Sequence, residues 1–134
     1  MPEPTRDFRP NPPEAAIMAM YLIGGDVAIW NDARKAYPEA VWDFSAMDLQ
    51  YVRGKDLSGV NLSNVVFGTI DLRDVKFFNA DLTNTDFSEA IITPHDVAAN
   101  FTGASMEGTK WPFSLETLAE ALDQQKKIDE GEIK

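Results

Sequence analysis

Large apolar residues recur at every fifth position over the middle of the chain. In the regular part they are Leu57, Leu62, Phe67, Leu72, Phe77, Leu82, Phe87 and Ile92. Smaller, mostly apolar or β-branched residues precede most of them by two positions, at Val60, Val65, Ile70, Val75, Ala80, Thr85 and Ala90. A period of five fits neither an α-helix nor an alternating strand, and a short fixed period is the signature of a solenoid. The stretch from Asp56 to Trp111 therefore predicts an all-β solenoid.

The repeat begins before this regular part, near Val41. Trp42-Asp43-Phe44 and Met47-Asp48-Leu49 both place an acid between two apolar residues. Eight residues, rather than five, then lead from Leu49 to Leu57. This spacing predicts a three-residue insertion at residues 51–55.

The repeat also continues beyond Ile92. Phe101, Met106 and Trp111 keep the spacing of five among themselves. Nine residues, rather than ten, lead from Ile92 to Phe101. This spacing predicts one missing residue near Pro94 and His95.

The flanking segments predict caps, because a solenoid otherwise leaves apolar faces and strand edges open at its ends. Residues 1–13 contain five prolines and predict a flexible arm. Residues 14–40 predict an N-terminal helical cap, with one helix from Glu14 to Ile23 and a second from Val27 to about Ala36. Residues 41–111 form the solenoid, and residues 112–134 predict a C-terminal helix, which Ser114 can cap, and a tail.

The composition limits the expected cellular location and the expected classes of binding partner. The chain of 134 residues has no cysteine and a net charge of −10. The absence of cysteine excludes disulfides and fits a reducing cytoplasm, and the apolar run from Ala15 to Ile23 is too short to span a membrane. The negative charge disfavours nucleic acid and anionic membranes as direct ligands and favours basic partners, although acidity can also serve solubility alone.

The sequence argues against an enzyme. His95 is the only histidine, and no triad, phosphate-binding loop or metal-ligand spacing is present. We therefore expect a non-enzymatic protein without a cofactor or metal. The regular acids have two open interpretations: they present charge to a partner, or they turn corners by hydrogen-bonding nearby backbone.

The repeat resembles the pentapeptide repeat family. Val60-Asn61-Leu62-Ser63-Asn64 and Ala80-Asp81-Leu82-Thr83-Asn84 are close to ideal copies of its unit. The resemblance covers about residues 26 to 111, because Trp30, Asn31 and Arg34 are similar to the helix that often precedes such repeats. It implies a right-handed quadrilateral β-helix of about three coils, with four pentapeptides in each coil and the large residues stacked in columns.

The implied coil assigns every large residue to one of four columns. The expected columns are Leu57 and Phe77; Leu62, Leu82 and Phe101; Phe44, Phe67, Phe87 and Met106; and Leu49, Leu72, Ile92 and Trp111. On this map the outward acids gather beside the third and fourth columns. They are Asp43, Asp48, Asp71, Asp74, Asp86, Glu89 and Glu107.

Some members of the family mimic duplex DNA, so the resemblance implies that these seven acids are a DNA-mimic patch. Three coils make a rod of about 15 Å, equivalent to about nine phosphates. This short rod favours an inhibitor of a restriction enzyme, a CRISPR surveillance complex or another phage-defence protein over one directed at gyrase. The predicted partner is thus a DNA-binding protein or complex.

The alternative is a structural scaffold that binds through its terminal helices. Apolar residues run almost all round the helix at residues 14–23, and Leu118 and Leu122 share a stripe on the C-terminal helix. This interpretation predicts a partner or a homodimer interface at Met18, Leu22, Leu118 and Leu122.

Overall fold

The computed structural model describes residues 12–36, 42–47, 49 and 52–131. Its elements are α1 (Pro12–Gly24), α2 (Val27–Arg34), β1 (Trp42–Phe44), β2 (Val65–Phe67), α3 (Pro94–Asn100) and α4 (Leu115–Asp129). Most of the predicted arm, residues 1–11, and the predicted start of the solenoid at Val41 lie outside the described residues. Among the described helices, none combines the length and the apolar character needed to cross a membrane.

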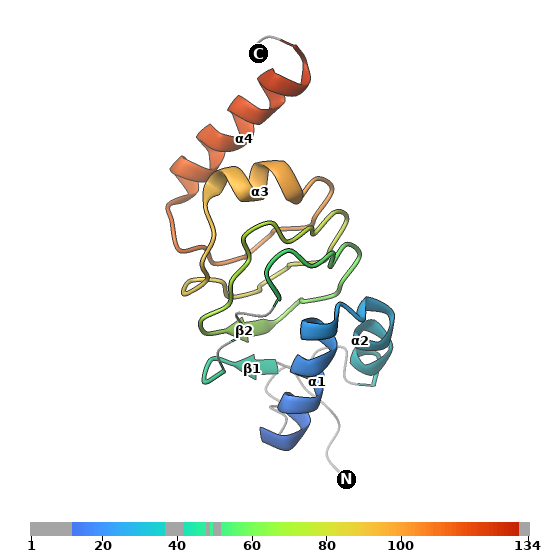
Figure 1. The fold of residues 1–134 in the computed structure, drawn as a ribbon. Helices are drawn as coiled ribbons and strands as arrows, with labels where there is room; N and C mark the ends of the chain where they lie inside the picture. Colours follow the sequence, from blue (N-terminus) through green and yellow to red (C-terminus); the bar gives the residue numbers. More distant parts are fainter. Residues whose placement is uncertain (1–11, 37–41, 48, 50–51, 132–134) are drawn as a thin grey trace.

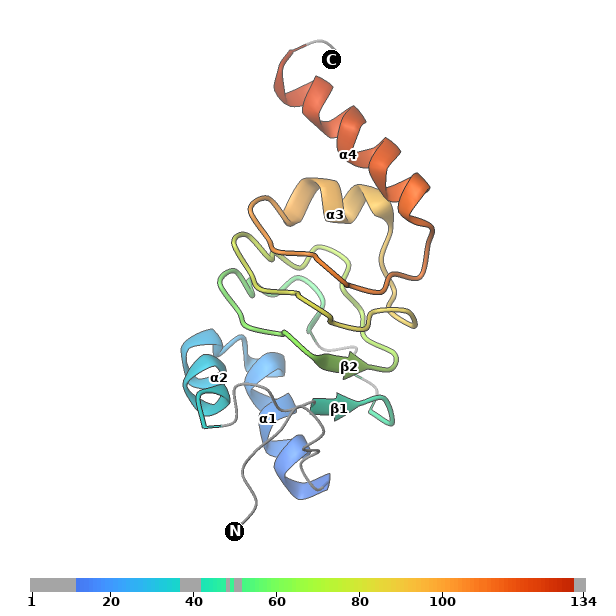
Figure 2. The ribbon, with the colours of Figure 1, turned by 180° about the vertical axis from the view of Figure 1, so that it is seen from behind.

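Coiled backbone forms the middle of the molecule, with one helix pair at each end (Figures 1 and 2). β1 pairs in parallel with β2, so that Phe44 lies beside Phe67. Further parallel bridges join Asp56 to Lys76 and Asn61 to Asp81, residues that are 20 apart. Since 20 residues hold four pentapeptides, the backbone pairs with itself once every four repeats, as in a β-helix.

Tight turns separate the short paired segments and explain why few residues form continuous strands. The N–H of Val60 donates to the carbonyl of Leu57 at 3.1 Å, and that of Val75 donates to Leu72 at 3.2 Å. Asn79 and Asn84 have positive φ values of 60° and 56° at the corners. Asparagine tolerates this conformation better than most residues, so the fifth position of the repeat encodes the turn.

The large residues stack in columns inside the coils, as the resemblance to the pentapeptide repeat family implied. Leu57, Leu62, Phe67, Leu72, Phe77, Leu82, Phe87 and Ile92 are all buried. In one column the ring centroids of Phe44 and Phe67 lie 5.8 Å apart and those of Phe67 and Phe87 5.3 Å apart. Contacts at these distances stabilise the stack beyond simple burial of apolar area.

The prediction of a missing residue near Pro94 and His95 is wrong, because α3 occupies this place. Asp81 pairs with Ser105 and Asp86 with Lys110, residues that are 24 apart instead of 20. The coil containing α3 therefore has four extra residues. Thr93 and Asp96 cap α3 reciprocally, each side chain bonding the other's backbone N–H, and this capping box starts the helix.

The extra residues move the end of the repeat by one column relative to the sequence-based map. Phe101 stacks on Phe77, with ring centroids 4.8 Å apart, rather than on Leu82. The N–H of Leu82 donates to the carbonyl of Ser105, which brings Met106 over Leu82. Trp111 stacks on Phe87, with centroids 5.7 Å apart, rather than on Ile92.

The predicted insertion at residues 51–55 is also misplaced. Val52 is completely buried, and the N–H of Gly54 donates to the carbonyl of Arg73, as the N–H of Gly59 does to Phe78. This register stacks Val52 beneath Leu72. Leu49 pairs with Ile70, whereas Phe44 pairs with Phe67. Two of the three extra residues therefore lie between Phe44 and Leu49, and the third lies between Leu49 and Val52.

Side chains of α2 close the lower backbone edge of the first coil beside the second column. Trp30 Nε1 donates to the carbonyl of Asn61 at 2.6 Å. Arg34 donates to the same carbonyl at 2.9 Å and to that of Ser63 at 2.6 Å. Burial lowers the pKa of Arg34 to about 10, with Asp81 opposing the shift, so the guanidinium stays charged at neutral pH. At the other end, α4 packs on α3.

Candidate interaction surfaces

Several acids of the predicted DNA-mimic patch hold turns of the repeat. Asp43, Asp71 and Asp86 each accept a hydrogen bond from the backbone N–H two residues later, at 2.9, 3.1 and 2.9 Å. Asp56, outside the patch, makes the same bond to the N–H of Ser58. These carboxylates fix local backbone, which is the second of the two interpretations left open by the sequence.

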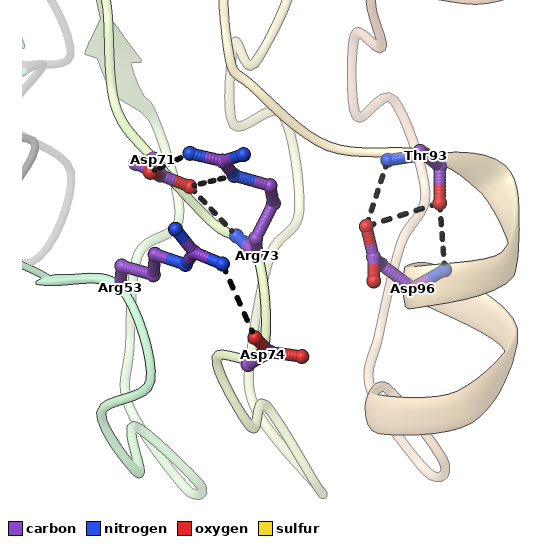
Figure 3. A network of polar contacts seen from close by, with 6 residues as sticks. All are labelled: Arg53, Asp71, Arg73, Asp74, Thr93 and Asp96. Atoms are coloured by element: carbon purple, nitrogen blue, oxygen red, sulfur yellow. Dashed lines mark hydrogen bonds and ion pairs between the residues drawn. The ribbon is translucent and has the colours of Figure 1, made fainter.

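Arginine neutralises the patch beside the fourth column (Figure 3). Arg73 donates to both carboxylate oxygens of Asp71, at 3.0 and 2.7 Å. The hydrogen bond from the Arg73 side chain is the main cause of the lowered pKa of Asp71, which is only 5% exposed. Arg53 lies 3.8 Å from Asp74, but both side chains are largely exposed, so this pair contributes little.

The remaining patch residues do not share one face. Asp86 and Glu89 lie beside the third column, where Asp86 pairs with Lys110 of the next coil. Glu107 follows Met106 and has moved to the second column with it. Glu89 and Glu107 are exposed, as is Asp43 in β1. Asp48 lies outside the described residues.

The regular part of the coil matches a known sequence family. Residues 56–93 fit the family model for pentapeptide repeats, in 8 copies. This segment is a pentapeptide-repeat array. Such repeats generally form β-helices and belong to structural or binding proteins rather than catalysts. No curated protein and no solved structure is significantly similar to the chain.

The helices flanking the pentapeptide array bury most of the predicted interface residues. Met18, Leu22 and Leu118 belong to the protein's own core. A partner cannot reach these three side chains, because the chain's own packing covers them. Of the predicted set only Leu122 is exposed, at 38%.

Other apolar residues of α4 face solvent. Leu115 is 71% exposed and Ile128 is 43% exposed. With 100° between successive helical residues, Leu115 and Leu122 lie together on one side of the buried pair Leu118 and Ala121, and Ile128 lies on the other. We call Leu115 and Leu122 the α4 flank.

One open pocket of about 490 Å³ lies at the other end of the array. The residues that line it are Gly25, Asp26, Val27, Ala28, Ile29, Asp56 and Ser58. His95 is remote from it, exposed in the first turn of α3. In the described part of the chain, no group of three or more histidines, cysteines or acids is placed to hold a metal ion.

Proposed function

We propose that this protein is a non-enzymatic binding module that self-associates through the α4 flank. The exposure of Leu115, 71% on a well-formed helix, carries the proposal. Among the described elements α4 packs on α3, and its C-terminal part extends away from the array in both views (Figures 1 and 2). An exposed apolar stripe on a helix that projects from the body is typical of a protein contact.

A second copy of the chain fits this flank because the flank is self-complementary. Leu115 and Leu122 are two helical turns apart, about 10 Å along the axis. In an antiparallel two-fold contact, Leu115 of one copy meets Leu122 of the other, and the reciprocal contact forms by symmetry. One pair of residues thus supplies both halves of the interface.

Light scattering after size exclusion tests the proposal. We expect a dimer for the wild type, and a folded monomer for the double variant Leu115→Glu and Leu122→Glu. Ile29→Glu is the matched control, because Ile29 is also exposed but lies on α2. A monomeric wild type at high protein concentration would refute self-association. Substitution of Leu118 is unsuitable, because that buried side chain supports the fold.

The array itself supports the finer model of a right-handed quadrilateral β-helix of about three coils. Its support is the spacing of 20 residues between bridges. The interval from Asp56 to Lys76, for example, holds three hydrogen-bonded turns and a bend at residues 68–69. Far-ultraviolet circular dichroism and a crystal structure test this model, and a coil of any number of sides other than four would contradict it.

Acidic DNA mimicry is the second candidate function. The observation in its favour is the exposure of Asp43, Glu89 and Glu107 on a chain with a net charge of −10. Because Arg73 binds Asp71 and Lys110 lies beside Asp86, the mimic would rest mainly on Glu89. The target would be a DNA-binding complex of restriction, CRISPR or another phage defence.

Competition with duplex DNA tests mimicry. We expect such a complex to bind the wild type, to release it when DNA is added, and to bind the Glu89→Lys variant more weakly. Lysine substitution of Glu120, on the outer face of α4, is the control for charge alone. Binding that duplex DNA does not displace would contradict mimicry.

A further inference from the structure

The lower edge of the first coil is closed beside the second column and open beside the first. Beside the second column, Asn31 Oδ1 accepts the N–H of Asn61. Trp30 and Arg34 donate to the carbonyls of Asn61 and Ser63. The equivalent groups beside the first column, five residues earlier, are the N–H and carbonyl of Asp56 and the carbonyl of Ser58.

These equivalent groups point away from the array. One coil higher, Lys76 uses its N–H and its carbonyl to bond downwards, to Lys55 and Leu57. The same backbone geometry aims the N–H and carbonyl of Asp56 below the first coil. Among the described residues none hydrogen-bonds to these groups of Asp56 or to the carbonyl of Ser58.

The open edge forms one wall of the pocket beneath the first coil. The turn between α1 and α2 and the first residues of α2 form the opposite wall. Asp26 precedes α2 as its N-cap residue, but its carboxylate makes no capping hydrogen bond. Asp26 and Asp56 therefore place two acidic residues beside a space that also presents backbone acceptors.

We propose that this pocket binds an arginine side chain of a partner protein. Arg34 shows how a guanidinium fits this type of edge, since it bridges the carbonyls of Asn61 and Ser63. An external guanidinium can bridge the carbonyls of Asp56 and Ser58 in the same way. Its charge then meets Asp26 and Asp56, and its stem can lie against the half-exposed Ile29.

Two lysines near the pocket do not occupy it. Lys76 belongs to the coil above Asp56, and its charge helps to lower the pKa of Asp56, after the hydrogen bonds from Ser58. Lys55 passes beside Gly25 but does not line the pocket. A lysine brings one compact charge, whereas the planar guanidinium matches two adjacent carbonyls, so we expect selectivity for arginine. The inference concerns the opposite end from α4 and is independent of self-association.

Backbone amide NMR tests the pocket with three short peptides in which the central residue is arginine, lysine or citrulline. The arginine peptide is expected to shift the amide signals of residues 25–29 and 56–58. Citrulline keeps the shape of the arginine side chain but removes its charge. Lysine keeps the charge but lacks the planar guanidinium with its paired N–H donors. Both should bind several-fold more weakly than arginine.

Variants distinguish binding at the pocket from general attraction to the negative charge of the protein. Asp26→Asn with Asp56→Asn should weaken binding of the arginine peptide about tenfold or more. Asparagine retains the turn, because Asn61 makes the equivalent bond to the N–H of Ser63. Asp86→Asn makes the same change at another turn and should leave binding unaltered.

Three results would overturn the proposal. The first is an absence of shifts at the highest soluble concentration of the arginine peptide. The second is equal affinity for arginine and lysine, which would indicate charge attraction alone. The third is movement of the same amide signals in the free full-length protein after Arg6→Ala or Arg9→Ala, which would assign the pocket to the chain's own N-terminal segment.

Discussion

Asn84 Oδ1 occupies the space that a Cβ atom on Gly108 would need. The two residues hold the same corner in successive coils, and the N–H of Asn84 donates to the carbonyl of Glu107 at 2.9 Å. Gly108 also has a φ of 72°, which side chains disfavour. The side chain of Asn84 therefore requires a glycine at position 108 in the next coil.

Gly108→Ala is expected to lower the free energy of unfolding by about 2–3 kcal/mol, since it combines an unfavourable φ with a clash. Gly59→Ala is the control, because Gly59 has a similar φ but no neighbouring atom within 4 Å of the place where its methyl group would lie. It should cost only about 1 kcal/mol. Urea denaturation measures both, and equal losses would show that Asn84 does not restrict Gly108.

Val52→Ala is expected to cost about 2–3 kcal/mol, because Val52 is fully buried beneath Leu72. Lys55→Ala, in the same predicted insertion but exposed, should change stability by less than about 0.5 kcal/mol. Thermal unfolding of the two variants distinguishes a core position from a bulge. If the Val52 variant were as stable as the wild type, the result would favour the predicted insertion at residues 51–55.

Arg34→Lys should destabilise the protein by about 2–4 kcal/mol, although the charge is kept. Lysine cannot bridge the carbonyls of Asn61 and Ser63 as Arg34 does, so a buried acceptor loses its donor. Lys35→Arg, an exposed exchange between the same residue types, is the control. Hydrogen exchange at residues 59–63 should accelerate in the Arg34 variant, and unchanged exchange would contradict the capping role.

Asp71 makes part of the free energy of unfolding dependent on pH in the acidic range. Its pKa is lowered from 3.8, first by the side-chain hydrogen bond from Arg73. A lowered pKa in the folded state means that the stabilisation is complete above the unfolded value and is lost as the pH falls through the folded value.

Asp71→Asn retains the turn but removes this titration. We expect the wild type to lose more stability than the variant as the pH is lowered below 3.8. Urea midpoints measured over this range provide the comparison, with Asp86→Asn as a control that leaves the Arg73 pair intact. Parallel losses in the wild type and the Asp71 variant would exclude the pair as the source.

The period of five identified the large buried residues, because each repeat places one of them inside the coil. The resemblance to the pentapeptide repeat family supplied their stacking in columns. The last coil was misassigned because the nine residues from Ile92 to Phe101 have two explanations. They fit two repeats with one residue missing, and they fit one repeat with four extra residues. Only the chemistry of Thr93 and Asp96, a capping box, distinguishes a helix from a deletion. Val52 was missed for a similar reason, since the spacing gives the size of an insertion but not its position.

The interaction surfaces were less predictable because they depend on residues far apart in the sequence. Lys110 meets Asp86 only after α3 has set the register of the last coil. The pocket at Asp56 forms only where α2 stops covering the edge. Likewise, Leu118 and Leu122 look equivalent in sequence, and packing on α3 separates the buried one from the exposed one.

The length of the segment containing α3 sets the relative direction of the two ends of the molecule. Each five-residue repeat advances the chain by one column, so an insertion or deletion of five residues there would turn α4 by one column relative to α2. Neither end would change in sequence or local structure. Evolution can therefore re-aim the α4 flank relative to the arginine pocket by altering a segment that belongs to neither.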